Sequence, residues 1–362
     1  MGASSSCRHA TTSESGVSTL QPLSAQRRQR VIVSSMAALA LLALAGSCVV
    51  GSVSVPLFEL PGALADIAAG RISNLSATLL NLRLGRAMSA FATGAGLALA
   101  GVMMQALLRN PLADPYVLGI SSGAAVGALA ALLFGAALWV VDLGAFAGAS
   151  SIAALLFVLA RRDLGGKGRA GVGGDSSTLL LTGVILSSAC MALVTLMLSI
   201  APESRLRGMV FWMIGDLSGA GWRMLPWVVL GVALVFALRQ ARALNVMALH
   251  ADGAAALGVN AGALRRSLFV VSALLTASAV STAGSIGFVG LIVPHACRYA
   301  FGPDHRVLLP AAALAGGAFL VLADTLARTV LAPQQLPVGV LTSLIGVPIF
   351  LFQLHQLRLR RS

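Results

Sequence analysis

The chain is poor in charged residues, since only 10% of its 362 residues are Asp, Glu, Lys or Arg. A soluble domain usually carries about 25% charged residues. Its hydrophobic fraction is 57% and its mean hydropathy is +0.90. This shortage of charge excludes an ordinary soluble protein and indicates a protein whose surface faces lipid.

Cysteine is scarce as well, and no two cysteines form a C-x-x-C pair. The four are scattered along the chain at Cys7, Cys48, Cys190 and Cys297. This pattern supports neither a disulfide framework nor a zinc site. We expect no metal site in this chain.

A phosphate-binding loop of the form G-x-x-x-x-G-K-[ST] is also missing. The nearest stretch, Gly165-Gly166-Lys167-Gly168, lacks both the spacing and the following hydroxyl residue. If the protein uses ATP, another chain must hydrolyse it. We therefore expect that this chain is not itself an enzyme and binds no cofactor of its own.

Long hydrophobic runs are what the sequence has in abundance. A helix needs roughly 20 apolar residues to cross about 30 Å of hydrocarbon. Continuous runs indicate helices, because barrel strands would alternate over about 10 residues. The sequence predicts an all-α integral membrane protein with about ten spans, two of them short. These are Val31–Val55, Ala87–Leu107, Val117–Val141, Leu143–Ala160, Leu179–Ile200, Leu225–Leu238, Ser267–Ala283, Ile286–Ala300, Val307–Ala323 and Leu336–Leu354.

The basic residues set the expected orientation. Lys and Arg number 25 against 12 Asp and Glu, and most of them fall in segments that are inside if the N-terminus is cytoplasmic. Both termini are then cytoplasmic, as an even number of spans requires. Residues 1–30 are polar and Ser/Thr-rich, which predicts a disordered cytoplasmic tail before a membrane domain at 31–357. A signal peptide is less favoured, because Arg27–Arg30 precedes a full-length span.

Two features concern the organisation of the spans. Pro202–Arg223 carries apolar residues at helical spacing, which predicts a short amphipathic helix on the outer surface. Each half of the chain could hold five spans. Because five is odd, the halves would then form an inverted repeat.

Charged side chains occur at the outer ends of two spans. Arg83 and Arg86 stand three apart on one helical face and could hold carboxylates of a docking partner. Alternatively, they bind lipid headgroups or an internal carboxylate such as Glu59 or Asp66. Asp324 and Arg328 lie one turn apart. They are interpreted either as a functional site or as an ion pair in which each group neutralises the other.

Three segments interrupt the spans. Asn110–Pro115 has two prolines that force a turn, and its Leu112 is suited to closing a pore, although a simple connector is the alternative. His250–Val259 predicts short helices, near residues 250–262, that fit a groove of a partner. Gly284–Leu291 followed by Pro294-His295 indicates a broken helix. For His295 a structural role is favoured over a proton relay.

The chain resembles the FecCD family of ABC importer permeases, which import cobalamin, haem and ferric siderophores. The resemblance extends from about Arg83 to the C-terminus, with Gly85 in place of the usual proline. Its motifs are Leu82–Arg86, Gly101 with Gln105, Asn110–Pro115 with Leu118–Gly123, Ala256–Val259, Gly284–Arg298, Asp304–Arg306, Ala323–Arg328, and Leu336–Gly339 with Ile345–Pro348.

The resemblance implies a ten-helix type II permease of two five-helix inverted repeats in the bacterial inner membrane. It implies a homodimer, two ATP-binding subunits that carry ATP and Mg, a periplasmic substrate-binding protein, and alternating access. It assigns binding-protein docking to Arg83, Arg86 and Arg328. It assigns ATPase coupling to Ala251, Asp252, Ala255, Leu257, Gly258 and Val259, and the cytoplasmic gate to Leu112, Ser176 and Ser177.

The cargo is interpreted from the outer half of the expected pathway. Met197, Met209, Met213 and Trp212, with Arg205 and Arg207 nearby, would suit an apolar macrocycle that bears carboxylates, so haem is favoured. Cobalamin and ferric siderophores stay open.

Two other protein classes are the rivals. An ion-coupled secondary transporter would need ionisable groups near the middle of its spans, and these are almost missing. A membrane-embedded enzyme would need an arranged catalytic cluster, which His295, Asp304 and His305 do not form.

Overall fold

The computed structural model describes residues 25–51, 53, 56–70, 74–164, 174–249 and 257–359. These residues form helices and connecting segments, with no strand among them. The α-helices are α1 (Ala25–Val49), α2 (Leu60–Ala68), α3 (Leu75–Leu108), α4 (Ile120–Leu133), α5 (Leu138–Leu164), α6 (Gly174–Ile200), α7 (Glu203–Ile214), α8 (Met224–Leu249), α10 (Ala261–Ala283), α11 (Val289–Phe301), α12 (His305–Ala327) and α13 (Val338–Leu359). Two 3-10 helices, η1 (Leu57–Glu59) and η2 (Pro115–Leu118), complete the described part.

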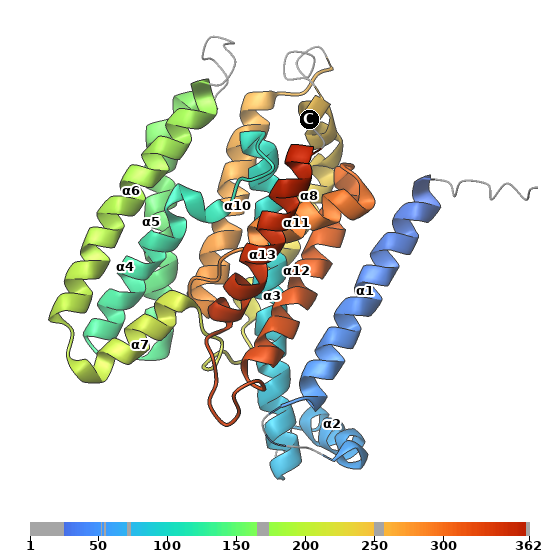
Figure 1. The fold of residues 1–362 in the computed structure, drawn as a ribbon, viewed down its shortest axis with the longest axis vertical. Coiled ribbons are helices and arrows are strands. Elements are labelled where there is room, and N and C mark those ends of the chain that lie inside the picture. Colours follow the sequence, from blue (N-terminus) through green and yellow to red (C-terminus); the bar gives the residue numbers. More distant parts are fainter. Residues whose placement is uncertain are drawn as a thin grey trace, which may run out of the picture.

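Ten of these helices run through the bundle, and α2 and α7 are shorter helices at one end of it (Figure 1). Seven described helices are long and apolar enough to cross a membrane by length and composition. The expected ten-helix bundle is confirmed by the ten helices that run through it. The helix α1 begins and α13 ends toward the same end, which we call the terminal end, and the opposite end is called the α2 end (Figure 1).

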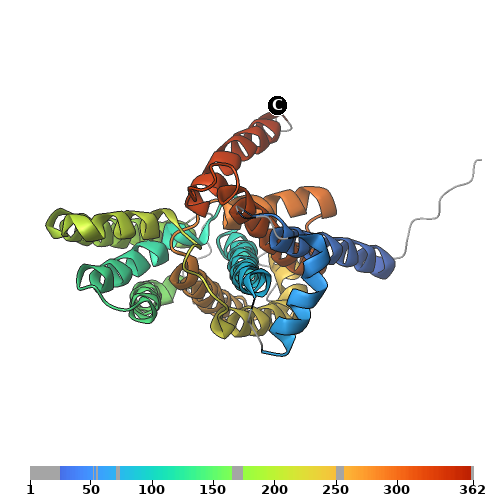
Figure 2. The ribbon, with the colours of Figure 1, turned by 90° about the horizontal axis from the view of Figure 1, so that it is seen from below.

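The helix α3 forms the centre of the larger part of the bundle. Its 34 residues extend over about 51 Å, and it packs against α8, α10, α11 and α12 (Figure 2). In the apolar window of α3, 94% of the residues are buried, compared with 17% in that of α1. Helix α1 is therefore a peripheral helix that packs on α12 and α3.

Glycines let α3 approach its neighbours closely. A Cβ atom on Gly94 would overlap the carbonyl oxygen of Gly316 in α12, and one on Gly101 would overlap that of Gly290 in α11. Small residues at helix contacts allow backbones to meet in the absence of a hydrophobic driving force in lipid. The helices α4 and α5 pack through glycines in the same way.

Two short helices hold equivalent places in the two five-helix halves. Helices α4 and α11 have 14 and 13 residues, which is less than a full crossing requires. Each is preceded by an irregular segment, and the two regions touch where Ser121 Oγ, in the first turn of α4, lies 2.8 Å from Ser285 Oγ, in the segment before α11. The Tyr116 hydroxyl also accepts a hydrogen bond of 3.2 Å from the backbone N–H of Ile286. This correspondence supports the inverted repeat.

Several predicted boundaries differ from the structure. Helix α1 begins at Ala25, before the predicted span, while residues 1–24 of the predicted tail lie outside the described residues. The predicted span Val117–Val141 is divided, because Gly135 has a φ of +69° and turns the chain from α4 into α5. The predicted amphipathic helix exists as α7 but ends at Ile214, since Gly215 at φ +90° ends it.

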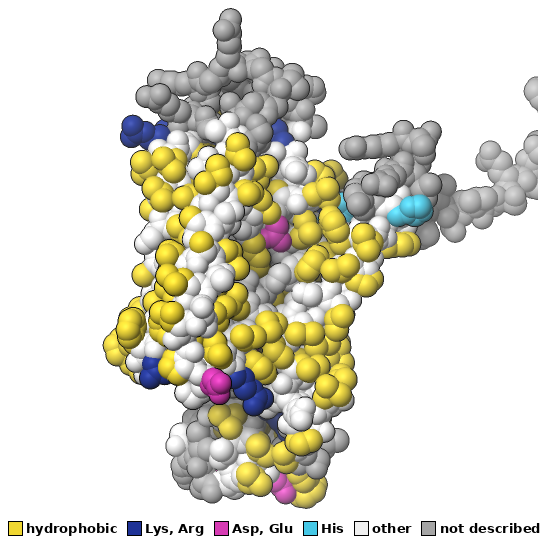
Figure 3. Space-filling model, turned by 60° about the vertical axis from the view of Figure 1, so that its left-hand side comes forward, with side chains coloured by type: hydrophobic (Ala, Val, Ile, Leu, Met, Phe, Trp, Pro, Cys, Tyr) yellow, Lys and Arg dark blue, Asp and Glu magenta, His cyan; other side chains and the backbone are white. Residues whose placement is uncertain are grey.

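The surface on the α6 side fits a membrane environment. Hydrophobic side chains cover the middle of this face, and Lys and Arg side chains lie near its two ends (Figure 3). The exposed hydrophobic residues of α6 include Leu181, Ile185 and Leu196.

Candidate functional site at the α2 end

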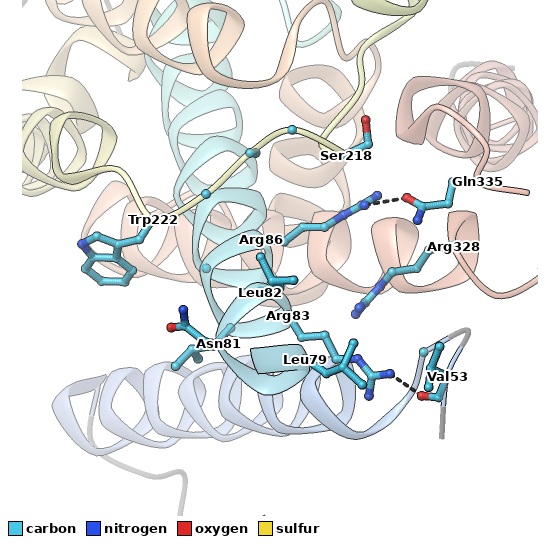
Figure 4. Close-up of a pocket in the computed structure, with 16 residues that line it drawn as sticks. Val53, Leu79, Asn81, Leu82, Arg83, Arg86, Ser218, Trp222, Arg328 and Gln335 are labelled. Atoms are coloured by element: carbon cyan, nitrogen blue, oxygen red, sulfur yellow. Dashed lines mark hydrogen bonds between the residues drawn. The ribbon is translucent and has the colours of Figure 1, made fainter. Parts of the chain in front are cut away.

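A pocket of about 590 Å³ opens at the α2 end of the bundle. Its wall combines the first turns of α3, the segment Ser218–Trp222, the end of α12 and residues that follow α1 (Figure 4). Arg83, Arg86 and Arg328 all line it, together with Gln335. The structure therefore brings together the three arginines that the sequence predicted as a docking site.

Arg86 is held by a carboxylate from the other half of the chain. Its Nε lies 3.0 and 2.9 Å from the two carboxylate oxygens of Asp324, and its Nη2 lies 2.7 Å from Oδ1. Its Nη1 donates a hydrogen bond of 2.7 Å to Gln335 Oε1 (Figure 4). Asp324 is only 1% exposed. The Arg86 guanidinium is thus bound on both edges.

The internal carboxylate differs from the sequence-based alternatives. Glu59 accepts a hydrogen bond from Ser76, and Asp66 accepts one from Asn74, so neither was the right candidate. The expected Asp324–Arg328 pair is present, with Nε 3.7 Å from Oδ2. Arg86 is the nearer partner of Asp324, and the sequence did not reveal this because 238 residues separate the two.

Arg83 and Arg328 bind the C-terminal end of α1. Arg83 Nη1 donates to the carbonyl oxygens of Cys48 and Val49 at 3.0 and 3.1 Å, and its Nη2 donates to that of Val53. Arg328 Nη2 donates to the carbonyl oxygen of Ser47 at 2.7 Å and to its hydroxyl at 3.0 Å. The last carbonyls of a helix lack partners within the helix and carry partial negative charge. The two arginines therefore cap α1.

The cluster contains more positive than negative charge. Among the described residues of the pocket wall and its bonded partners, three guanidinium groups face the single carboxylate of Asp324. Backbone carbonyls offset the remaining charge only partly. An acidic group that entered this pocket would meet donors arranged for a carboxylate.

The predicted pathway residues on and beside α7 are less open than expected. Met209 is fully buried in the core formed by α4, α5 and their neighbours, so it does not line an open passage in this conformation. Met197, Met213 and Trp212 are partly buried against the same core. The apolar face of α7 therefore serves packing.

The two arginines of α7 are in different environments. Arg205 donates to the carbonyl oxygen of Leu133 and so caps the end of α4. The Arg207 guanidinium carbon lies 5.3 Å from the centre of the Phe211 ring. Only Arg207 is exposed to solvent.

The predicted coupling and gate residues are only partly described. Ala251, Asp252 and Ala255 lie outside the described residues. Leu257 is 71% exposed in the turn before α10, Gly258 follows it with a φ of +76°, and Val259 packs on the core.

Leu112 is 37% exposed in the loop that follows α3. Ser176 and Ser177 lie in the first turn of α6, and their side chains are outside the described part of the structure.

Sequence reasoning missed residues whose partners are distant in the chain. Ser47 and Gln335 complete the arginine cluster. Asn245 of α8 joins the start of α12, where its amide donates to Asp304 at 2.7 Å and its Oδ1 accepts from the backbone N–H of His305 at 2.9 Å. No local pattern marks these three residues.

The chain matches the model of the FecCD transport family over residues 37–356. It is 42% identical over 297 residues to the hemin transport system permease protein HmuU of Yersinia pestis, covering 78% of this chain and 84% of that protein. It is 43% identical over 284 residues to the cobalamin import system permease protein BtuC of Halobacterium salinarum, covering 77% of this chain and 73% of that protein.

A solved structure, assigned to the metal-chelate type of ABC transporter in an inward-facing conformation, is also similar. Its identity is 30% and its TM-score 0.75, with 90% of this chain and 99% of that chain covered. The family match, the helix order and the extent of the similarity agree with one another. The chain belongs to the FecCD family and is a multi-pass, ten-helix permease of type II ABC importers.

Proposed function

We propose that this chain is the membrane-spanning subunit of a haem importer in the bacterial inner membrane. Two copies form the translocation pathway, and two separate ATP-binding subunits that carry ATP and Mg drive it. A periplasmic binding protein delivers the cargo. The permease itself catalyses no reaction and binds no cofactor.

The observation that carries this proposal is the arginine cluster of Arg83, Arg86 and Arg328. It lies in a pocket at the α2 end and has one carboxylate for three guanidinium groups among the described residues. Carboxylates of a binding protein are the chemistry that such forks recognise. Docking therefore takes place at the α2 end.

The distribution of basic residues supports the same orientation. The first two turns of α1 carry Arg27, Arg28 and Arg30, and the first two turns of α10 carry Arg265 and Arg266. Both lie at the terminal end of the bundle, where α1 begins and α13 ends (Figure 1). Cytoplasmic loops are enriched in such residues, so the terminal end faces the cytoplasm and the α2 end the periplasm.

The mechanism is alternating access, with the ATPase acting at the cytoplasmic end. The segment Ala251–Val259 seats on the ATPase, and its exposed Leu257 offers an apolar contact. Leu112, Ser176 and Ser177 form the cytoplasmic gate. ATP binding shifts the gate through the coupling segment, because ligands bias an equilibrium between two states.

Haem is the proposed cargo, and cobalamin is the second candidate. The similarity to HmuU of Yersinia pestis, a hemin transport permease, supports haem, and the similarity to BtuC of Halobacterium salinarum supports cobalamin at nearly the same identity. Arg207 is the exposed cation of α7 and would favour a macrocycle with carboxylates. An ion-coupled transporter is the alternative from another class.

The test is uptake in proteoliposomes that contain the permease with its ATPase. ATP-dependent accumulation of haem is measured with and without the binding protein, and cobalamin is run in parallel. Haem uptake that requires both ATP and the binding protein supports the proposal. Accumulation of cobalamin but not haem would move the cargo to the second candidate. Uptake driven by an ion gradient without ATP would contradict the importer mechanism.

A further inference from the structure

The two arginines that cap α1 hold the end of a peripheral helix, which packs on α12 and α3. Arg83 donates to the carbonyls of Cys48, Val49 and Val53, and Arg328 donates to Ser47. Only 17% of the apolar window of α1 is buried. Hydrogen bonds from the two guanidinium groups to helix-end carbonyls therefore add to this packing in fixing the end of α1.

These bonds are weaker than those that a carboxylate offers. The end of a helix carries roughly half an elementary charge, whereas a carboxylate carries a full charge and can bind a guanidinium with two parallel bonds. Both kinds of bond are charge-assisted, because the guanidinium is ionised, and the carboxylate adds its full charge and bidentate geometry. A carboxylate that reached Arg83 or Arg328 would displace the α1 carbonyls. Arg86 differs, because Asp324 and Gln335 already occupy its donors.

We propose that the C-terminal turn of α1 is the resting occupant of Arg83 and Arg328, and that an acidic side chain of the docking binding protein replaces it. The replacement releases the end of α1 from the bundle, so docking at the surface is converted into movement of a membrane helix. Arg86 stays bound to Asp324 and keeps α3 joined to α12. This inference rests on the proposed docking function.

Gly51 makes the proposal testable without removing any charge. A Cβ atom at Gly51 would lie 2.5 Å from Arg83 Nη2 and 2.6 Å from its Cζ. The far end of a flexible side chain would move, so Gly51→Ala pushes Arg83 off the α1 carbonyls. Gly46 lies on the last turns of the same helix, and a Cβ there meets nothing within 4 Å. Gly46→Ala is the matched control.

Cys48 provides a natural reporter at the capped turn. It is partly exposed, whereas Cys190 and Cys297 are buried and serve as internal controls. The permease–ATPase complex in nanodiscs is treated with a membrane-impermeant maleimide, with and without the binding protein. Labelling of each cysteine is measured by peptide mass spectrometry, and docking affinity is measured by biolayer interferometry.

The proposal predicts that docking raises labelling of Cys48 severalfold and leaves Cys190 and Cys297 unlabelled. Gly51→Ala should raise Cys48 labelling without the binding protein and tighten docking about twofold to fivefold, because the competing occupant is lost. Arg83→Gln should raise labelling as well but weaken docking by at least about tenfold.

Two results would overturn the inference while the docking function stands. One is normal docking with unchanged Cys48 labelling, and the other is a Gly51→Ala variant that behaves like Gly46→Ala in both measurements. Failure of the unmodified complex to bind any binding protein would instead contradict the proposed function. In that case Cys48 labelling in Gly51→Ala still decides whether Arg83 caps α1.

Discussion

Arg86 of α3 and Asp324 of α12 form an ion pair with three contacts of 3.0 Å or less, although 238 residues separate them. The pair joins the first half of the chain to the second at the α2 end. Both side chains are buried. A buried carboxylate is tolerated when it is paired and hydrogen-bonded, and here the partners are Arg86 and Arg328.

Removing Asp324 should cost more stability than removing either arginine. Asp324→Asn leaves two buried guanidinium groups without a carboxylate, whereas Arg86→Gln leaves Asp324 paired with Arg328. We expect a loss of about 3–5 kcal/mol for Asp324→Asn and a smaller loss for Arg86→Gln. Thermal unfolding of the purified variants in detergent shows which substitution lowers the stability more.

The matched control is Arg223→Gln. Arg223 forms an ion pair with Asp142, and the two side chains are 26% and 29% exposed, respectively. Ion pairs near the surface contribute about 0–1 kcal/mol to stability. Equal losses for Arg223→Gln and Asp324→Asn would refute the central role of Asp324.

The close contact between α3 and α11 should not tolerate a methyl group. Gly101→Ala places a Cβ against the backbone carbonyl of Gly290, so the two helices must separate and neighbouring packing is lost. Overpacking of this kind costs about 1–3 kcal/mol or more. We expect a lower unfolding temperature and a lower yield of folded protein.

Gly231→Ala in α8 is the control, because a Cβ there meets nothing within 4 Å. Alanine favours a helix over glycine by about 1 kcal/mol, so this variant should be neutral or slightly more stable. A Gly101→Ala variant as stable as Gly231→Ala would show that the helices are not in contact as described.

Cysteines at Ser121 and Ser285 should form a disulfide. The two hydroxyl oxygens are 2.8 Å apart, at the place where the first turn of α4 meets the irregular segment before α11. Mild oxidation of Ser121→Cys/Ser285→Cys should therefore cross-link the two halves, detected as a mobility shift after cleavage between them. A pair of cysteines at Ser122 and Ser285 is the control.

If these segments move apart during alternating access, the cross-link should also stop ATP-driven uptake, and reduction should restore it. Full uptake by a completely cross-linked protein would show that this contact stays closed throughout the cycle.

Stability at acidic pH should depend on Asp304, which caps α12 outside the span. Partial burial raises the pKa of Asp304, but the backbone N–H of Arg306, the Asn245 amide and nearby positive charge together lower it below its ordinary value of 3.8. Since the folded-state pKa is depressed, the stabilisation is present above the unfolded value and is lost as the pH falls through the folded-state pKa.

We therefore expect the unfolding temperature of the unmodified protein to fall more steeply below about pH 4 than that of Asp304→Asn. Asparagine keeps the cap without the charge. At neutral pH, Asp304→Ala should lose about 1 kcal/mol through the missing cap. Identical pH profiles for the unmodified protein and Asp304→Asn would contradict the charge-dependent role.

The sequence by itself determined the class of protein and the places of its membrane helices. Continuous apolar runs have few physical outcomes, because a backbone in hydrocarbon must satisfy its own hydrogen bonds. The runs therefore became helices, and the breaks at Asn110–Pro115 and Gly284–Leu291 appeared where proline and glycine indicated them. Arg83, Arg86 and Arg328 were also recognisable, because they lie at span ends where the expected orientation disfavours arginine.

The tertiary structure alone decided what these arginines touch. Helix packing brings Asp324 to Arg86 and the end of α1 to Arg83 and Arg328, and no local pattern encodes contacts between residues that lie from 30 to 281 positions apart. Packing also decided that Met209 is buried. Apolar side chains at helical spacing fit a pathway and a core equally well in sequence, and only the arrangement of neighbouring helices separates the two.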